Sequence, residues 1–226
     1  MTDGIVAAAD GSSGGAWVHE RIRVGRFDVE VSRPGAPEDL IDEDEYAVDE
    51  RLPYWAELWP SARVLAAALV DERLRSLRVI ELGCGVGLPA IVAALSGAEV
   101  TATDWYEAAI QATRTNAKCS GTELRTCLLD WRNPPADLLA VPFDLVIAAD
   151  VCYEARNADA LATLLPQLVA KRGTFLMADP RRPDTVTLID ALEKMGWTAT
   201  LAEWPAIGRP DESGSVIHLH RVNPPR

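Results

Sequence analysis

Three glycines at alternate positions stand where a ligand-binding turn is expected. Gly83, Gly85 and Gly87 lie between an expected strand over residues 77–82 and an expected helix over residues 88–96. Glycine lets a backbone turn sharply and come close to a ligand. The spacing G-x-G-x-G differs from the dinucleotide pattern G-x-G-x-x-G, so the turn alone is weak evidence. The alternative is a tight strand-to-helix turn that holds no ligand.

An acidic residue follows the second expected strand, residues 99–103. In open α/β sheets, ligands bind outside the carboxyl ends of the strands. Asp104 stands at such an end, where its carboxylate can accept hydrogen bonds from both hydroxyl groups of a ribose. The alternative is that Asp104 caps the helix that follows it.

The third expected strand, residues 122–129, is followed by an acid and an aromatic residue. Asp130 can accept a hydrogen bond from an amino group, and the Trp131 indole can stack against a purine. Tryptophan is also common in protein cores, so the alternative is that Trp131 packs without touching a ligand.

The fourth expected strand, residues 143–149, is apolar and leads into a second acid with an aromatic residue nearby. Asp150 and Tyr153 follow Ala149 at the carboxyl end of this central strand. The reacting centre of such folds lies at that edge of the sheet. The alternative is that Asp150 caps the next turn and Tyr153 packs against its surroundings.

Three aromatic residues precede the first helix of the main domain. Tyr54, Trp55 and Trp59 lie in the segment 53–61, in a loop before an expected helix over residues 61–74. We expect this loop to form a lid over the ligand. A purely structural contact with the core is the alternative.

Strands and helices alternate along most of the chain, which predicts a doubly wound α/β sheet. A hairpin of residues 17–24 and 27–31 is expected before the main domain. We divide the chain into residues 1–52, with a flexible N-terminus, this hairpin and an acidic connector, and a domain of residues 53–226. Expected helices after the first two are 106–120, 159–170 and 183–195; the remaining expected strands are 173–178, 197–204 and 215–222, and the last two form an antiparallel pair.

Composition narrows the function classes. The chain has 226 residues, of which 22 are Lys or Arg and 34 are Asp or Glu, giving a formal net charge of −12. Hydrophobic residues make up 48%, which excludes a chain disordered throughout. The negative charge disfavours nucleic acid as a partner, because phosphates would be repelled. The richest apolar run, residues 64–70, is much shorter than the ~20 residues of a membrane span.

The N-terminus and the cysteines bear on the cellular compartment. Residues 1–15 lack the basic start of a secretory signal. Cys84, Cys119, Cys127 and Cys152 form no C-x-x-C pair and lie far in sequence from the histidines. We therefore expect reduced thiols and no metal site. The expected protein is cytoplasmic, monomeric and free of membrane contact.

Together, these motifs resemble a known family. Residues 81–87 with Asp104 resemble the class I, or seven-β-strand, S-adenosyl-L-methionine-dependent methyltransferases, whose Rossmann-like sheet has a reversed last strand. The protein-lysine methyltransferase branch of this class carries an Asp-x-x-Tyr motif after the fourth strand. The segments that resemble this branch are 58–61, 129–131, 149–153 and 179–183.

Within that branch, the sequence is most similar to the members that modify the electron-transfer flavoprotein β-subunit. The similarity lies in the aromatic segments 53–56 and 59–60 and in the run Asp-Pro-x-Arg-Pro at 179–183. The resemblance covers about residues 53–197. It implies a mostly parallel seven-stranded sheet with an antiparallel last strand. It also implies S-adenosyl-L-methionine as the cofactor and a protein that presents a lysine as the substrate.

The resemblance further implies a role for particular residues. Asp150 and Tyr153 would border the methyl acceptor as the catalytic residues. Many relatives lack an acid at the position of Asp130, so this sequence departs from the family pattern there. The residues implied to bind the cofactor are Trp59, Glu81, Gly83, Cys84, Gly85, Gly87, Asp104, Trp105, Asp130, Trp131 and Ala149.

Three functions compete at this point. The first is methyl transfer to a protein lysine, and the second is methyl transfer to a small-molecule acceptor. The third is a cofactor-binding module without turnover, or a nicotinamide-dependent enzyme. The glycine spacing and the lack of a separate catalytic domain speak against a nicotinamide enzyme. Residues 150–153 also differ from the Asn/Asp-Pro-Pro-Tyr/Phe loop that many nucleic-acid amino-methyltransferases carry there.

Overall fold

The protein forms a seven-stranded sheet in which the last strand of the chain runs opposite to the other six. The structure is a computed structural model that describes residues 16–40, 52–207 and 215–225. The sheet order β5-β4-β3-β6-β7-β9-β8 confirms the predicted doubly wound fold. Its strands are β3 (Arg78–Leu82), β4 (Glu99–Asp104), β5 (Arg125–Leu128), β6 (Phe143–Ala149), β7 (Val169–Asp179), β8 (Thr198–Pro205) and β9 (Val216–Asn223).

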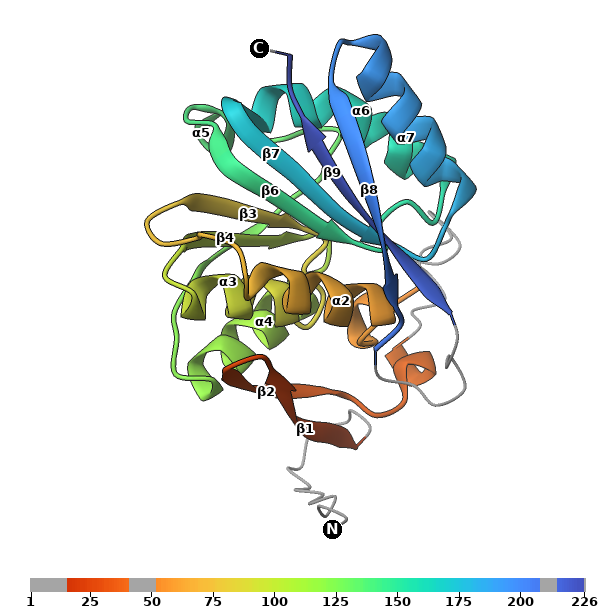
Figure 1. Ribbon diagram of the computed structural model, residues 1–226. Coiled ribbons are helices and arrows are strands. Elements are labelled where there is room, and N and C mark those ends of the chain that lie inside the picture. The colour runs from red at the N-terminus through yellow and green to blue at the C-terminus, as the bar shows by residue number, and fades with distance from the viewer. Residues whose placement is uncertain (1–15, 41–51, 208–214, 226) are drawn as a thin grey trace.

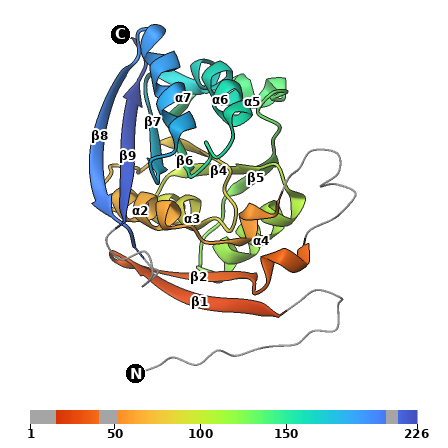
Figure 2. The same cartoon turned by 90° about the vertical axis from the view of Figure 1, so that its right-hand side faces the viewer.

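Helices cover both faces of this sheet (Figures 1 and 2). One face carries α2 (Pro60–Leu69), α3 (Leu88–Leu95) and α4 (Glu107–Cys119). The other carries α5 (Ala136–Leu139), α6 (Ala155–Leu168) and α7 (Pro183–Lys194). Each face has its own buried apolar cluster. The neighbours β3 and β6 lie at the centre, where the strand order reverses and such sheets bind ligands.

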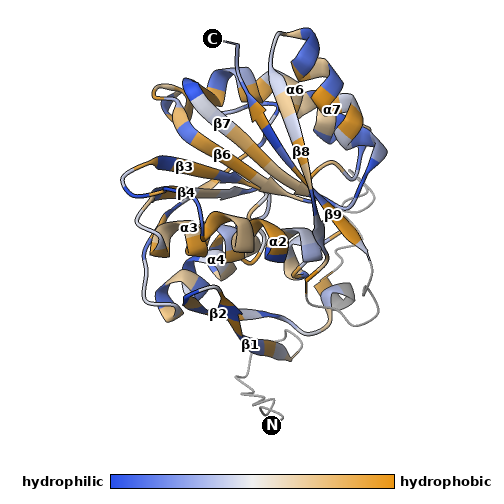
Figure 3. Cartoon of the chain, viewed as in Figure 1, coloured by the Kyte–Doolittle hydropathy of each residue, from blue (hydrophilic) through white to orange (hydrophobic). Residues whose placement is uncertain are grey.

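The central strands are apolar because both of their faces are covered. Val79, Ile80, Val146 and Ile147 are completely buried, as expected for parallel strands between two helical layers. Figure 3 shows this apolar character along β3 and β6.

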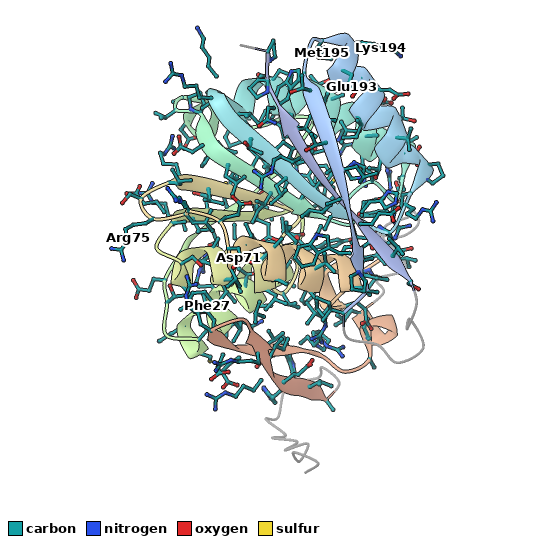
Figure 4. All side chains as sticks on the ribbon, viewed as in Figure 1. Phe27, Asp71, Arg75, Glu193, Lys194 and Met195 are labelled. Carbon is teal, nitrogen blue, oxygen red and sulfur yellow. The ribbon has the colours of Figure 1, made fainter. Side chains whose placement is uncertain are left out.

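An antiparallel hairpin forms a further layer outside the helices. It consists of β1 (Trp17–Val24) and β2 (Phe27–Pro34), which confirms the predicted hairpin and extends its second strand. The hairpin packs on α3 and α4, and the Arg26 guanidinium donates a 3.4 Å hydrogen bond to the carbonyl of Val70. Figure 4 shows Phe27 on this side of the molecule and Lys194, which ends α7, at the opposite end.

Several boundaries differ from the sequence prediction. Helix α2 ends at Leu69 rather than at residue 74, because the N–H groups of the next three residues, 70–72, bond to carbonyls three residues back and form tighter turns. Helix α6 begins four residues before the predicted start and leads directly into β7. Strand β5 is shorter than predicted. The short helices α5, η1 (Pro37–Leu40) and η2 (Tyr54–Ala56) were not predicted.

Part of the predicted N-terminal region falls outside the described residues. This concerns the expected flexible start, residues 1–15, and residues 41–51, which hold much of the expected acidic connector. Within the described ranges, every helix is too short or too polar to pass through a membrane.

Candidate functional site

A cavity of about 470 Å³ lies at the carboxyl ends of the central strands. This volume is within the range of pockets that bind small molecules. The turns after β3, β4 and β6 line it, as do the segment after β5 and the loop before α2. The cavity lining includes all predicted site residues except Gly87, namely Trp59, Glu81, Gly83, Cys84, Gly85, Asp104, Trp105, Asp130, Trp131, Ala149, Asp150 and Tyr153.

The glycine turn after β3 (residues 83–87) allows close contact with the aromatic loop before α2 (residues 53–59). Gly85 has a left-handed φ of 53°, and a Cβ atom there would lie 3.0 Å from the carbonyl oxygen of Trp55. The aromatic loop therefore lies directly against the glycine turn at one side of the cavity. A side chain at Gly85 would force these two segments apart.

Gly87 is the one predicted site residue outside the cavity lining, and it packs against α4. It precedes α3 with a φ of 87°, and a Cβ atom there would lie 2.7 Å from Oγ1 and Cγ2 of Thr113 in α4. Its missing side chain therefore permits close packing of the glycine turn against α4, away from the cavity lining.

Gly87→Ala is expected to lower the free energy of unfolding by about 2–4 kcal/mol, the combined cost of a left-handed alanine and an overpacked contact. The matched control is Gly121→Ala. Gly121 has a φ of 75°, and a Cβ atom there would meet nothing within 4 Å, so only the backbone cost applies. Urea denaturation measures both variants, and equal losses would contradict a packing role for Gly87.

Asp104 ends β4 and is only 6% exposed. One carboxylate oxygen accepts a 2.9 Å hydrogen bond from the N–H of Gly85, and the other accepts a 3.0 Å bond from the N–H of Tyr106. Burial raises the pKa of this carboxyl, and the backbone N–H donors oppose the shift. The carboxylate thus holds the glycine turn and the start of the next helix, and it retains acceptor positions for a ligand.

Two further buried groups line the cavity beneath the glycine turn. Glu81 is 1% exposed and accepts a 2.8 Å hydrogen bond from the N–H of Ala90 in the first turn of α3. Burial raises the pKa of Glu81 well above its usual value. Burial also raises the pKa of the Cys84 thiol, so this sulfur stays protonated and is a poor nucleophile.

Aromatic side chains surround the cavity on several sides. The Trp59 indole donates a 3.0 Å hydrogen bond to the carbonyl of Tyr54, and their rings lie 6.1 Å apart. Trp131 packs on the buried cluster between the sheet and helices α6 and α7, and it also lies near Gly83. Its contact with a purine stays a prediction.

An arginine that the sequence analysis did not single out joins two predicted residues. The Arg132 guanidinium lies 5.5 Å from the ring centre of Trp105. Its Nε also donates a 3.0 Å hydrogen bond to Asp130. The Asp130 carboxylate, expected to meet a ligand amino group, therefore already has a cationic partner within the protein.

Asp150 stands in an unusual conformation at the end of β6. Its φ is 57°, its N–H donates a 2.9 Å hydrogen bond to the carbonyl of Ala178, and the residue is 8% exposed. Its carboxylate pairs with the Arg182 guanidinium. Non-glycine residues with a left-handed φ occur mostly at functional sites, where the surrounding contacts hold them in this conformation. Helix α6 has its N-cap at Glu154, so Asp150 is not the cap of that helix.

Burial raises the pKa of the Asp150 carboxyl, and the hydrogen bond and charge of Arg182 oppose the shift. The backbone of Arg182 is itself held in place, since its backbone N–H donates a 2.8 Å hydrogen bond to the Asp179 carboxylate. Asp179 is 1% exposed and also accepts a 2.7 Å bond from the Thr185 hydroxyl. The run 179–183 therefore builds a cationic partner for Asp150, a role that the sequence analysis did not assign.

Tyr153 forms the outer wall of this part of the cavity. Its side chain is 41% exposed, and its ring meets that of Tyr54 edge-on, with centres 5.2 Å apart. The cavity thus has a buried carboxylate at one side and an aromatic pair at its mouth. Among the described residues, no three His, Cys, Asp or Glu side chains gather as metal ligands.

The fold is that of the Rossmann-like methyltransferases. A Synechocystis magnesium protoporphyrin IX methyltransferase, solved with bound SAM, matches with a TM-score of 0.56 at 20% identity, covering 81% of this chain and 86% of that one. The chain belongs to the lysine methyltransferase family, whose model matches residues 53–194.

The relatives that match the chain are named as protein methyltransferases, for lysine or for arginine. The electron transfer flavoprotein beta subunit lysine methyltransferase of Xenopus laevis is 33% identical over 142 residues, which are 58% of this chain and 53% of the relative. A human histone-arginine methyltransferase is 38% identical over 115 residues, which are 47% of this chain and 60% of the relative. The chain spans about half the length of the flavoprotein-modifying relatives.

Proposed function

We propose that this protein transfers a methyl group from S-adenosyl-L-methionine to the side-chain amine of a lysine in another protein. The observation that carries the proposal is a single cavity in which the glycine turn and Asp104 adjoin the buried Asp150–Arg182 pair. The family supports lysine as the acceptor.

The residues at the glycine turn fit this cofactor. Gly83 and Gly85 line the cavity without side chains, so a ligand can approach their backbone, and the buried Asp104 carboxylate suits the hydroxyl groups of a ribose. Trp59 and Trp131 offer apolar walls for a flat purine ring. When bound, the cofactor would supply a methyl group on a sulfonium sulfur, which a neutral amine can accept while the thioether leaves with the electron pair of the broken S–C bond.

The residues at the other side of the cavity fit a lysine. A lysine amine has an unperturbed pKa of ~10.4, so it arrives protonated at neutral pH. Asp150 accepts hydrogen bonds from the entering ammonium and keeps the amine oriented once its proton has left to water. Tyr153 forms a wall beside the aliphatic chain and offers its hydroxyl as a further polar contact.

The charge of Arg182 has a second consequence for this mechanism. It favours the ionised form of Asp150 against the cost of burial. Because methyl transfer needs the ionised carboxylate, the rate falls as the pH falls through the pKa of Asp150. Arg182→Gln removes the opposing charge, so we expect the acidic limb of kcat/KM to move to higher pH.

Rates measured across the pH range at saturating cofactor test this expectation. Arg182→Lys, which keeps a positive charge, should move the limb less than Arg182→Gln. Arg181→Gln is the matched control, because Arg181 is an exposed neighbour outside the cavity lining. An unchanged limb in Arg182→Gln would contradict the assigned role.

The acceptor itself is found by labelling. The protein is incubated with a cell lysate and cofactor labelled at the methyl group, and the labelled products are analysed by mass spectrometry. The electron-transfer flavoprotein β-subunit, named for several relatives, is the first purified acceptor to test. We expect methyl-lysine in a protein. Label confined to small molecules or nucleic acid would overturn the proposal, and methyl-arginine would replace lysine as the acceptor.

Four free thiols agree with the cytoplasmic location proposed for this activity.

A further inference from the structure

The N-terminal hairpin lies outside the segment matched by the family model but shares a core with the main sheet. Ile22, Val24, Val29 and Val31 of the hairpin are at most 7% exposed. They belong to the same buried cluster as residues of α2, α3 and β3. The hairpin is therefore packed on the helices that support the glycine turn.

One buried side chain connects the hairpin to that turn. Asn116 of α4 is 1% exposed. Its amide nitrogen donates a 2.9 Å hydrogen bond to the carbonyl of Val86, within the glycine turn, and a 3.1 Å bond to the carbonyl of Ser32 in β2. Its amide oxygen accepts a 2.8 Å bond from the N–H of Ser32. Both amide donors are thus used, one on each segment.

Two neighbours on the same face of α4 contact only one of the segments. Thr113, one turn earlier and completely buried, donates a 2.9 Å hydrogen bond from its hydroxyl to the carbonyl of Gly85. Ser120, the C-cap residue of α4, accepts a 3.0 Å bond at its hydroxyl from the N–H of Glu30 in β2. Residues three and four apart share a helix face, so a row of polar side chains leads from the glycine turn to the hairpin.

The edge of β2 needs these partners. Glu30 and Ser32 pair with Arg21 and His19 of β1, yet their N–H groups bond to side chains of α4. An uncovered strand edge presents unpaired backbone groups. Asn116 and Ser120 therefore accept hydrogen bonds from the backbone N–H groups on the edge of β2 that faces α4. The hairpin in turn holds the Asn116 amide in its position.

We propose that Asn116 is a positioning residue that couples the hairpin to the cofactor site. Loosening either segment leaves a buried amide group without a partner, which is costly. Order in the hairpin and order in the glycine turn therefore favour each other, and such coupling is reciprocal. The inference rests on the proposed cofactor site at the glycine turn, and it extends the support of that site to the N-terminal hairpin.

Hydrogen exchange of the full-length protein tests the coupling without any substitution. S-adenosylhomocysteine should slow exchange of the Ser32 amide, although this residue is not part of the cavity lining. Calorimetry on the same sample measures ligand binding. Binding without slower exchange at Ser32 would overturn the coupling and leave the proposed function intact. Failure of the wild-type protein to bind the ligand would overturn both.

Substitutions on α4 separate positioning from stability. Asn116→Ala should weaken S-adenosylhomocysteine binding at least fivefold and abolish the ligand-dependent protection at Ser32. Ser120→Ala is the matched control: it should speed exchange at Glu30 and change affinity less than twofold. Thr113→Val, which loses only contacts with the turn, should weaken binding and should speed hairpin exchange less than Asn116→Ala does.

If Asn116→Ala unfolds, Asn116→Ser replaces it, and the same two measurements apply. A variant that lowers the melting temperature but keeps wild-type affinity and wild-type protection at Ser32 would show that Asn116 is merely structural. That result would overturn the proposal.

Discussion

Asp150→Asn is expected to lower the rate of methyl transfer by about 100-fold, the effect typical of losing a group that manages a proton or orients a nucleophile. The substitution keeps the shape of the side chain and removes its charge. Asparagine also tolerates the left-handed φ of 57° at this position. The backbone should therefore stay in place while the contact with the lysine ammonium is lost.

Stability and cofactor binding should change little in this variant. The Arg182 side chain is 33% exposed, so water can solvate the guanidinium that Asp150 no longer neutralises. Initial rates at saturating cofactor measure transfer, while calorimetry and thermal unfolding measure binding and stability. Tyr153→Phe should be milder, because the ring that forms the wall of the cavity remains.

Asp144→Asn is the matched control for Asp150→Asn. Asp144 lies at the opposite end of β6 and accepts a 2.9 Å hydrogen bond from the N–H of Arg78, which an amide oxygen can also accept. We expect near-normal transfer in this control. Wild-type turnover in a stable Asp150→Asn protein that binds cofactor would show that the carboxylate is structural, and its catalytic role would have to be withdrawn.

Asp104→Ala is expected to weaken S-adenosylhomocysteine binding by at least tenfold. A hydrogen bond to a charged group contributes about 1.5–3 kcal/mol, and about 1.4 kcal/mol corresponds to a factor of ten in Kd. The structure adds a second reason, since the N–H groups of Gly85 and Tyr106 would lose their acceptor. The glycine turn would then be less well ordered before the ligand arrives.

Calorimetry and thermal unfolding together distinguish these contributions. Asp104→Asn keeps one acceptor oxygen, which can serve the N–H of Gly85 or that of Tyr106 but not both, and loses the charge. Its affinity should fall between that of the wild type and the alanine variant. Glu99→Gln, at the exposed start of β4, is the control and should bind normally. Unchanged affinity in a folded Asp104→Ala protein would exclude this carboxylate from the cofactor site.

The local elements of the fold could be predicted because each depends on residues close together in the chain. Apolar runs between two helical layers mark β3 and β6, and glycines mark the turn before α3. Boundaries were less predictable. The apolar periodicity of α2 continues to Leu74, which is 2% exposed, but Leu74 lies in the loop after the helix.

The site could be predicted as far as strand order alone brings residues together. Because the ends of parallel strands meet at one edge of the sheet, Asp104, Trp131 and Asp150 were expected near one another, and all three line the cavity. Gly87 shows the limit of this argument. A pattern of glycines indicates where the backbone needs freedom, but whether the neighbour is a ligand or Thr113 depends on how α4 packs.

The sequence by itself therefore determined the class of fold, the order of its elements and most of the residues around the cavity. Tertiary structure alone decided which charged and polar groups pair. Asp150 and Arg182 are 32 positions apart, and Asn116 and Ser32 are 84 apart. Nothing in their local patterns specifies these partners. They meet because β6 lies beside β7 and because the hairpin packs against α4, and such contacts are set by burial of apolar surface between distant segments.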